Sequence, residues 1–237
     1  MATLVKDILI FCLEDILIPG KINPNLKIEG TKALLDGMKT FGKSHPELRI
    51  FLISTLQKEV FDTKMKDFSL FSYFDPSMVF AVDEAYIASK SPEDKILYDQ
   101  RCGEDPYCKD EYFRQVQMQA ILEKKGATPE KALLIGHDYW FDGFYTRRFS
   151  KVDMAFMTDA LSSRDKPIAE KIEGLWYVSR DWNSIQRLLE GKESPPNYNF
   201  LDTFVTTTIA EELLGGKGFP LIKKVVLERQ RERSGVS

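Results

Sequence analysis

The stretch Ile8–Leu17 reads ILIFCLEDIL and places apolar residues directly before a polar cluster. A short continuous apolar run of this kind predicts a buried parallel strand. Its polar end carries Cys12, Glu14 and Asp15, and the turn Ile18–Gly20 follows. In doubly wound α/β folds, ligands bind at the carboxyl ends of such strands. We therefore expect any chemistry of this chain to lie at this polar end.

Strands and helices alternate along the rest of the chain. Apolar runs predict further strands at 49–54, 77–82, 132–136, 152–157 and 176–179. Apolar residues at helical spacing predict helices at 31–43, 59–68, 111–125, 142–149 and 182–189. This alternation predicts a three-layer α/β fold, in which helices cover both faces of a mainly parallel sheet.

The predicted α/β domain covers residues 1–191. The polar stretch 83–111 is long for a connection and indicates an insertion or a minimal cap. Residues 192–237 are expected to form a linker and a C-terminal helical extension, with two helices within 201–233. An apolar stripe on the last helix indicates docking on this protein, on a second copy or on a protein partner.

Composition narrows the class of protein. The chain has 237 residues and a net charge of −3, which argues against a general nucleic-acid binder. No apolar run approaches the length that spans a bilayer, and the N-terminus carries no signal-peptide pattern. Three cysteines do not make a disulfide framework. We expect a cytoplasmic protein without membrane or nucleic-acid partners.

Polar residues recur at the ends of three predicted strands. The first strand continues as Cys12-Leu13-Glu14-Asp15, and the second, FLIST, ends at Ser54 and Thr55. The segment KALLIGHDYWFDG gives Gly136-His137, with Asp142 five positions after the histidine. The lead-in to that segment, GATPEKA, and the earlier FSYFD fit the same pattern.

Over about residues 8–189, these motifs resemble the haloacid dehalogenase-like (HAD) superfamily. The resemblance implies a Rossmann-like fold and a phosphatase or related hydrolase. In that family an aspartate attacks the substrate, a second aspartate acts as acid, Mg²⁺ is bound, and a lysine neutralises a phosphorylated ligand. Carried over residue by residue, the resemblance implies that Cys12, Glu14 and Asp15 form the first motif. It implies that Ser54, Thr55 and Lys109 bind the phosphate. It implies that His137, Asp138 and Asp142 bind the metal ion.

Several of these positions depart from the family pattern. Cys12 stands at the nucleophile position, and a thiol is a poor partner for Mg²⁺. Glu14 carries its carboxyl group one methylene further from the backbone than aspartate does. His137 replaces a metal-binding acid, and imidazole suits Zn²⁺ or Ni²⁺ better than Mg²⁺. Tyr112 occupies the register of the family's lysine, and Lys109 is the nearest substitute.

Our leading hypothesis is that the chain has lost aspartate-nucleophile phosphatase activity and acts by binding a ligand or another protein. The alternative is a divergent Mg²⁺-dependent phosphohydrolase. That enzyme would use Glu14 or Asp15 as acid or base, Asp138 and Asp142 on the metal, and Ser54 and Lys109 on the phosphate. A third hypothesis is a protein-interaction module built on 201–233.

Cys12 itself leaves two interpretations open. It is either a thiolate nucleophile or a small buried apolar residue at a strand end. Together with His137 and Asp142 it could also contribute to a soft-metal site. No closely spaced pair of ligands in the sequence supports that metal site.

Overall fold

The computed structural model describes residues 3–81, 88, 91–93, 117–123, 126–163, 166–169 and 174–199. The chain divides into two compact units, Met1–Pro196 and Asn197–Ser237. Most of the predicted insertion at 83–111, and all of 201–233, lie outside the described residues. The minimal cap, the C-terminal helices and their partners therefore stay predictions.

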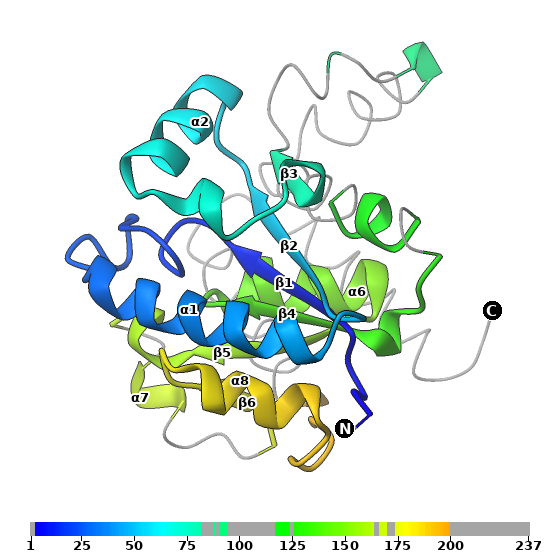
Figure 1. Ribbon diagram of the computed structural model, residues 1–237. Coiled ribbons are helices and arrows are strands. Elements are labelled where there is room, and N and C mark those ends of the chain that lie inside the picture. The colour runs from blue at the N-terminus through cyan, green and yellow to red at the C-terminus, as the bar shows by residue number, and fades with distance from the viewer. Residues whose placement is uncertain are drawn as a thin grey trace, which may run out of the picture. The chain divides into compact units, whose positions relative to one another are not determined.

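A six-stranded parallel sheet forms the centre of the first unit, in the order β3-β2-β1-β4-β5-β6 (Figure 1). The strands are β1 Ile8–Cys12, β2 Arg49–Ser54, β3 Val79–Ala81, β4 Ala132–Gly136, β5 Asp153–Met157 and β6 Trp176–Val178. Phe11 of β1 lies opposite Leu52 of β2 and Ile135 of β4. All of β1 is buried, which explains its continuous apolar sequence. The predicted α/β class is confirmed.

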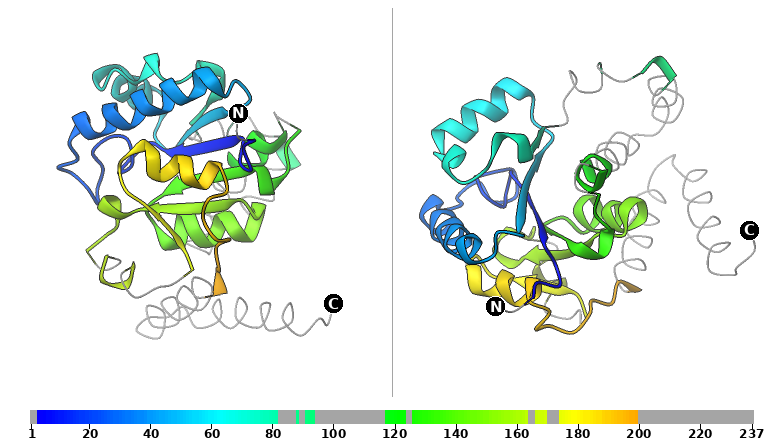
Figure 2. Two further views of the ribbon diagram at one scale, coloured as in Figure 1. Left: turned by 60° about the horizontal axis from the view of Figure 1, so that its bottom comes forward. Right: turned by 45° about the vertical axis from the view of Figure 1, so that its right-hand side comes forward.

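Helices cover both faces of this sheet. Those with defined bounds are α1 Ile28–Ser44, α2 Lys58–Asp67, α6 Thr146–Ser150, α7 Lys166–Ala169 and α8 Trp182–Leu189. Residues 117–123 are also helical. Helices α1 and α8 lie side by side on one face, and α6 lies on the opposite face (Figures 1 and 2). The sheet with helices on both faces is the three-layer arrangement that the sequence predicted.

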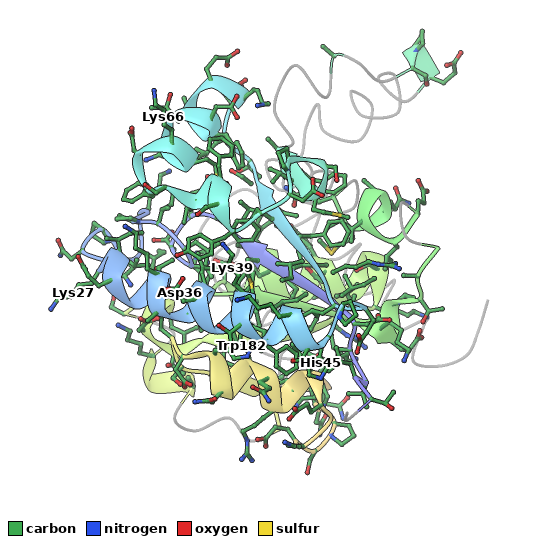
Figure 3. All side chains as sticks on the ribbon, viewed as in Figure 1. Lys27, Asp36, Lys39, His45, Lys66 and Trp182 are labelled. Atoms are coloured by element: carbon green, nitrogen blue, oxygen red, sulfur yellow. The ribbon has the colours of Figure 1, made fainter. Side chains whose placement is uncertain are left out.

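Aromatic packing joins α1 to α8. Phe41 stacks on His45 with 3.9 Å between ring centroids and lies 5.3 Å from the ring of Trp182. Figure 3 shows Trp182 and His45 at this contact. Gly37 allows the close approach, because a Cβ there would lie 2.5 Å from Cβ of Trp182.

Several elements differ from their predicted bounds by one to three residues, and for two of them the structure shows the reason. The strand expected at 77–82 starts later, at Val79, because Pro76–Met78 forms a 3₁₀ turn capped by the Asp75 side chain. The helix expected at 142–149 starts earlier, as the π-helix η4 at Tyr139–Tyr145, and continues as α6. The π-helix has consequences for the site described below.

Among the described residues, no helix is both long enough and apolar enough to cross a membrane.

Replacing Gly37 by alanine should destabilise the packing of α1 on α8. The added methyl group overlaps Trp182, and overpacking of this kind costs about 1–3 kcal/mol. Gly42→Ala is the matched control, because it lies in the same helix with nothing within 4 Å of the new Cβ. Urea denaturation should show a loss for Gly37→Ala and no loss for Gly42→Ala. Equal free energies of unfolding for the two variants would contradict this packing.

Candidate functional site

Residues from three distant parts of the chain meet at the carboxyl ends of β1, β2 and β4. The chain runs from β1 outward to β2 and β3, then returns to β4 on the other side of β1. This change of direction is a topological switch point, the usual ligand position in open α/β sheets. Cys12 ends β1, Ser54 ends β2 and Gly136 ends β4. The structure thus brings these three predicted motifs to one edge.

Cys12 and Asp142 form a buried hydrogen bond across this edge. The Cys12 thiol donates to Oδ1 of Asp142, with 3.2 Å between sulfur and oxygen. Oδ2 of the same carboxylate accepts the backbone N–H groups of His137 at 2.8 Å and Asp138 at 3.1 Å. Asp142 is only 1% exposed. Both oxygens are therefore bonded within the protein, as a buried carboxylate requires.

The π-helix η4 holds Asp142 in this position. The Asp138 side chain caps the turn by accepting the N–H of Phe141, and its carbonyl accepts the N–H groups of Asp142 and Gly143. The wide turn places the Asp142 side chain against Gly136. A Cβ on Gly136 would lie 2.5 Å from Cβ of Asp142. Only glycine permits this approach. π-Helical turns are rare and concentrate at functional sites.

Asp15 organises the loop after β1. Oδ1 of Asp15 accepts the backbone N–H groups of Ile22 at 2.9 Å and Asn23 at 2.7 Å. Its backbone has a φ of 63°, in the left-handed region that few residues other than glycine adopt. A Cβ on Gly20 would lie 2.4 Å from the Asp15 carboxylate. The predicted acid or base is therefore a buried loop anchor in this structure.

His137 lies between the carboxylates of Asp15 and Asp142. Its Nε2 is 3.6 Å from Oδ2 of Asp15, and its Nδ1 is 3.5 Å from Oδ2 of Asp142. Nδ1 is buried and has no hydrogen-bond partner among the described residues. These contacts are too long for good hydrogen bonds, so the ring lies between the two carboxylates without a good hydrogen bond to either.

Glu14 pairs with Ser54 rather than with Cys12 or Asp142. The Ser54 hydroxyl donates to Oε1 of Glu14 at 2.9 Å and accepts the N–H of Leu56 at 3.0 Å. Burial raises the pKa of Glu14, and the nearby Asp15 adds to the rise; the Ser54 hydrogen bond acts in the opposite direction. Glu14 therefore holds a proton more readily than an exposed glutamate does.

The structure describes two of the three predicted phosphate-binding residues, Ser54 and Thr55. The Ser54 hydroxyl is already bonded to Glu14 and to Leu56. Thr55 follows it and is exposed. Lys109 lies outside the described residues, so its predicted role stays a prediction.

The donor set at this edge does not fit Mg²⁺. Mg²⁺ requires near-octahedral oxygen ligands, whereas Cys12 and His137 offer sulfur and nitrogen. The Asp138 carboxylate caps η4, and both oxygens of Asp142 are bonded within the protein. Within the described ranges, no group of three His, Cys, Asp or Glu side chains could hold a metal ion. That finding also counts against the soft-metal site of Cys12, His137 and Asp142.

Two polar residues at this edge were not singled out from the sequence. The buried Gln117 donates its side-chain N–H to the carbonyl of Ser54 at 3.0 Å. Arg180 donates to the carbonyl of Ile16 and pairs with Asp159 at 2.7 Å, which fixes the loop after β1. In the sequence, Gln117 was only weakly indicated, as a side-chain amide within a predicted helix. Arg180 follows the predicted sixth strand, and that position was the only indication.

Comparison with known proteins finds similar structures at low sequence identity. No family model matches the chain, and no curated protein matches its sequence at a significant level. Solved structures do match. The cobalt-bound deoxy-D-mannose-octulosonate 8-phosphate phosphatase of Haemophilus influenzae is 13% identical, with a TM-score of 0.42, over 79% of this chain and 91% of that one.

Two further structures have similar scores. An uncharacterised protein of Listeria monocytogenes is 14% identical over 78% of this chain and 99% of that one, with a TM-score of 0.47. A haloacid dehalogenase-like protein of unknown function from Agrobacterium tumefaciens is 10% identical over 79% of this chain and 100% of that one, with a TM-score of 0.45. This last structure carries the name of the superfamily that the motif spacing resembles. Identities and TM-scores this low establish no activity, metal or substrate for this chain.

Glu14→Gln should change how stability depends on pH. Because the pKa of Glu14 is raised above its ordinary value of 4.5 in the folded protein, the fold favours the protonated side chain. That stabilising contribution is complete below the ordinary value and is lost as pH rises through the raised pKa. The free energy of unfolding of wild type should therefore fall relative to Glu14→Gln as pH rises.

Urea denaturation across pH measures this difference, and Glu47→Gln, at an exposed glutamate, gives the background effect of removing a surface charge. If the difference between wild type and Glu14→Gln does not vary with pH beyond that background, the burial of Glu14 described above is wrong.

Asp142→Ala should destabilise the protein by about 3 kcal/mol, since it leaves buried donors without their acceptor. The donors are the Cys12 thiol and the N–H groups of His137 and Asp138. The control is Asp67→Ala, at an exposed aspartate, which should change the free energy of unfolding by less than about 0.5 kcal/mol. Similar values for the two variants would contradict the described role of Asp142.

Proposed function

We propose that this chain is a haloacid dehalogenase-like protein that no longer transfers phosphoryl groups and acts by binding. The observation that carries the proposal is the hydrogen bond between Cys12 and Asp142. The thiol at the nucleophile position donates a hydrogen bond to a buried carboxylate whose other oxygen accepts two backbone N–H groups. The motif positions of the fold remain, but their side chains are bonded to one another.

The surroundings of Cys12 support the loss of nucleophilic attack. Reactive cysteines act as thiolates and lie in electropositive surroundings. Cys12 is instead bonded to the carboxylate of Asp142 and is only 8% exposed. A carboxylate beside the thiol opposes the negative charge that an attacking sulfur would need.

The charges at the same edge oppose a phosphate group. Ser54, the predicted phosphate-binding hydroxyl, donates to Glu14. Asp15 and Asp142 place two further carboxyl groups within reach of His137. A phosphate monoester is an anion, and without a bound cation it would meet these carboxyl groups. A divalent cation that could offset them does not fit the donors present.

Glu14 is the one feature that favours the alternative of a divergent phosphohydrolase. A carboxyl group with a raised pKa is suited to general acid catalysis nearer neutral pH. In that enzyme Glu14 would protonate the leaving group, and its hydrogen bond to Ser54 would position it. This alternative predicts a turnover rate that falls as pH rises through the raised pKa of Glu14.

Turnover of a broad panel of phosphate esters in the presence of Mg²⁺ distinguishes the two functions. We expect rates equal to a protein-free blank for wild type and for Glu14→Ala, because the Cys12 thiol at the nucleophile position is bonded to the buried carboxylate of Asp142. Turnover above the blank that disappears in Glu14→Ala and persists in the surface variant Lys66→Ala would contradict the proposal and establish the phosphohydrolase. Each variant is first compared with wild type by circular dichroism, so that loss of fold is not read as loss of activity.

A further inference from the structure

A pocket of about 280 Å³ lies between α2 and β3. β3 stands first in the strand order of the described sheet, and Figure 1 shows α2 and β3 on the same side of the molecule. None of the lining residues was among the site residues predicted from the sequence. The apolar ones include Phe61, Phe71, Pro76, Val79, Phe80 and Ala81.

Packing inside the protein holds the pocket walls in place. Phe61 is only 2% exposed. The ring of Phe80 lies 5.8 Å from the ring of Phe51 in β2. The Asp75 side chain caps the 3₁₀ turn that begins at Pro76. The pocket is therefore largely formed without a ligand, as most sites for small molecules are.

Phe71 leaves apolar surface at the opening of this pocket. It is 46% exposed, although phenylalanine is among the residues most often buried. A single exposed apolar residue needs no explanation. At the opening of an apolar pocket, however, its ring offers a wall that a ligand could cover.

The charges at the pocket offset each other. Lys58 and Asp62 are the charged side chains among the described lining residues, and they form an ion pair within α2. A charged ligand would therefore leave water for apolar walls without gaining a free counter-charge. Gln117 also lines the pocket and donates to the carbonyl of Ser54, which places the pocket beside the end of β2. The lining thus favours an uncharged ligand next to the strand-end site.

The volume of the pocket limits the size of that ligand. A cavity of about 150 Å³ holds a benzene ring, so a pocket of about 280 Å³ has room for two fused rings. It is close to the lower limit of about 300 Å³ for small-molecule sites. Aromatic rings pack favourably against the phenylalanine rings that line it. We propose that the pocket binds a small uncharged molecule with two fused aromatic rings, an inference that rests on the proposed binding function and names its ligand class.

Calorimetric titration of the full chain with 1-naphthol, an uncharged two-ring probe, tests the proposal. Wild type should show saturable binding with a Kd below about 1 mM. Ala120→Leu should weaken binding by about tenfold or more, because the longer side chain occupies space in the pocket that Ala120 lines. Ala33→Leu, at an exposed alanine of α1, is the matched control and should bind as wild type does.

A second pair of variants tests the opening of the pocket. Phe71→Ala removes an exposed ring and should weaken binding by about threefold or more, because the ligand loses apolar contact area. Val60→Ala is its control, because Val60 is 45% exposed on α2 and is not among the described lining residues. If Ala120→Leu does not fold, Phe71→Ala and Val60→Ala decide the question.

A wild type without saturable binding, or binding that neither Ala120→Leu nor Phe71→Ala weakens, would overturn the proposal. So would 1-naphthyl phosphate that binds as tightly as 1-naphthol, because the ligand would then not need to be uncharged. Hydrolysis of 1-naphthyl phosphate would instead overturn the proposed function and leave the pocket inference standing. A chain that neither hydrolyses the ester nor binds 1-naphthol would overturn the pocket inference alone.

Discussion

The hydrogen bond between the Cys12 thiol and the Asp142 carboxylate is the interaction on which the rest of the site depends. It joins the end of β1 to the π-helix after β4 across the switch point of the sheet. Because Asp142 is buried, its carboxylate requires hydrogen-bond donors within the protein. The thiol and the two backbone N–H groups after Gly136 supply them and stabilise the observed loop conformation.

Around this bond, residues that the sequence predicted to act in catalysis or ligand binding make hydrogen bonds that hold the loops in place. Asp15 anchors the loop after β1, Asp138 caps η4, and Ser54 is bonded to Glu14. His137 lies between the carboxylates of Asp15 and Asp142. A strand-end edge of an α/β sheet is normally left open for a ligand. Here Cys12 is hydrogen-bonded to Asp142 and Ser54 to Glu14, so these side chains are engaged within the protein.

The sequence predicted what depends on local pattern and missed what depends on distant contacts. The apolar run that begins at Ile8 predicted β1, and the helix predicted at 182–189 has the same bounds as α8. That Cys12 and Asp142 would lie at one edge was implied by the resemblance of the motifs to the haloacid dehalogenase-like superfamily. No local pattern indicated the π-helical turn, the left-handed backbone of Asp15 or the loop contact of Arg180. The contact of Arg180 depends on Ile16, which lies 164 residues earlier in the chain. The roles proposed for 83–111 and 201–233 lie outside the described residues.

The most direct measurement is a diffraction experiment on crystals grown with Mn²⁺ and phosphate. The anomalous signal of Mn²⁺ locates any bound metal ion independently of the protein atoms. The account predicts no anomalous peak near Asp142, with the Cys12 thiol still within hydrogen-bond distance of its carboxylate and the Ser54 hydroxyl still on Glu14. A Mn²⁺ peak at coordination distance from Asp142, with phosphate density between Cys12 and Ser54, would contradict it.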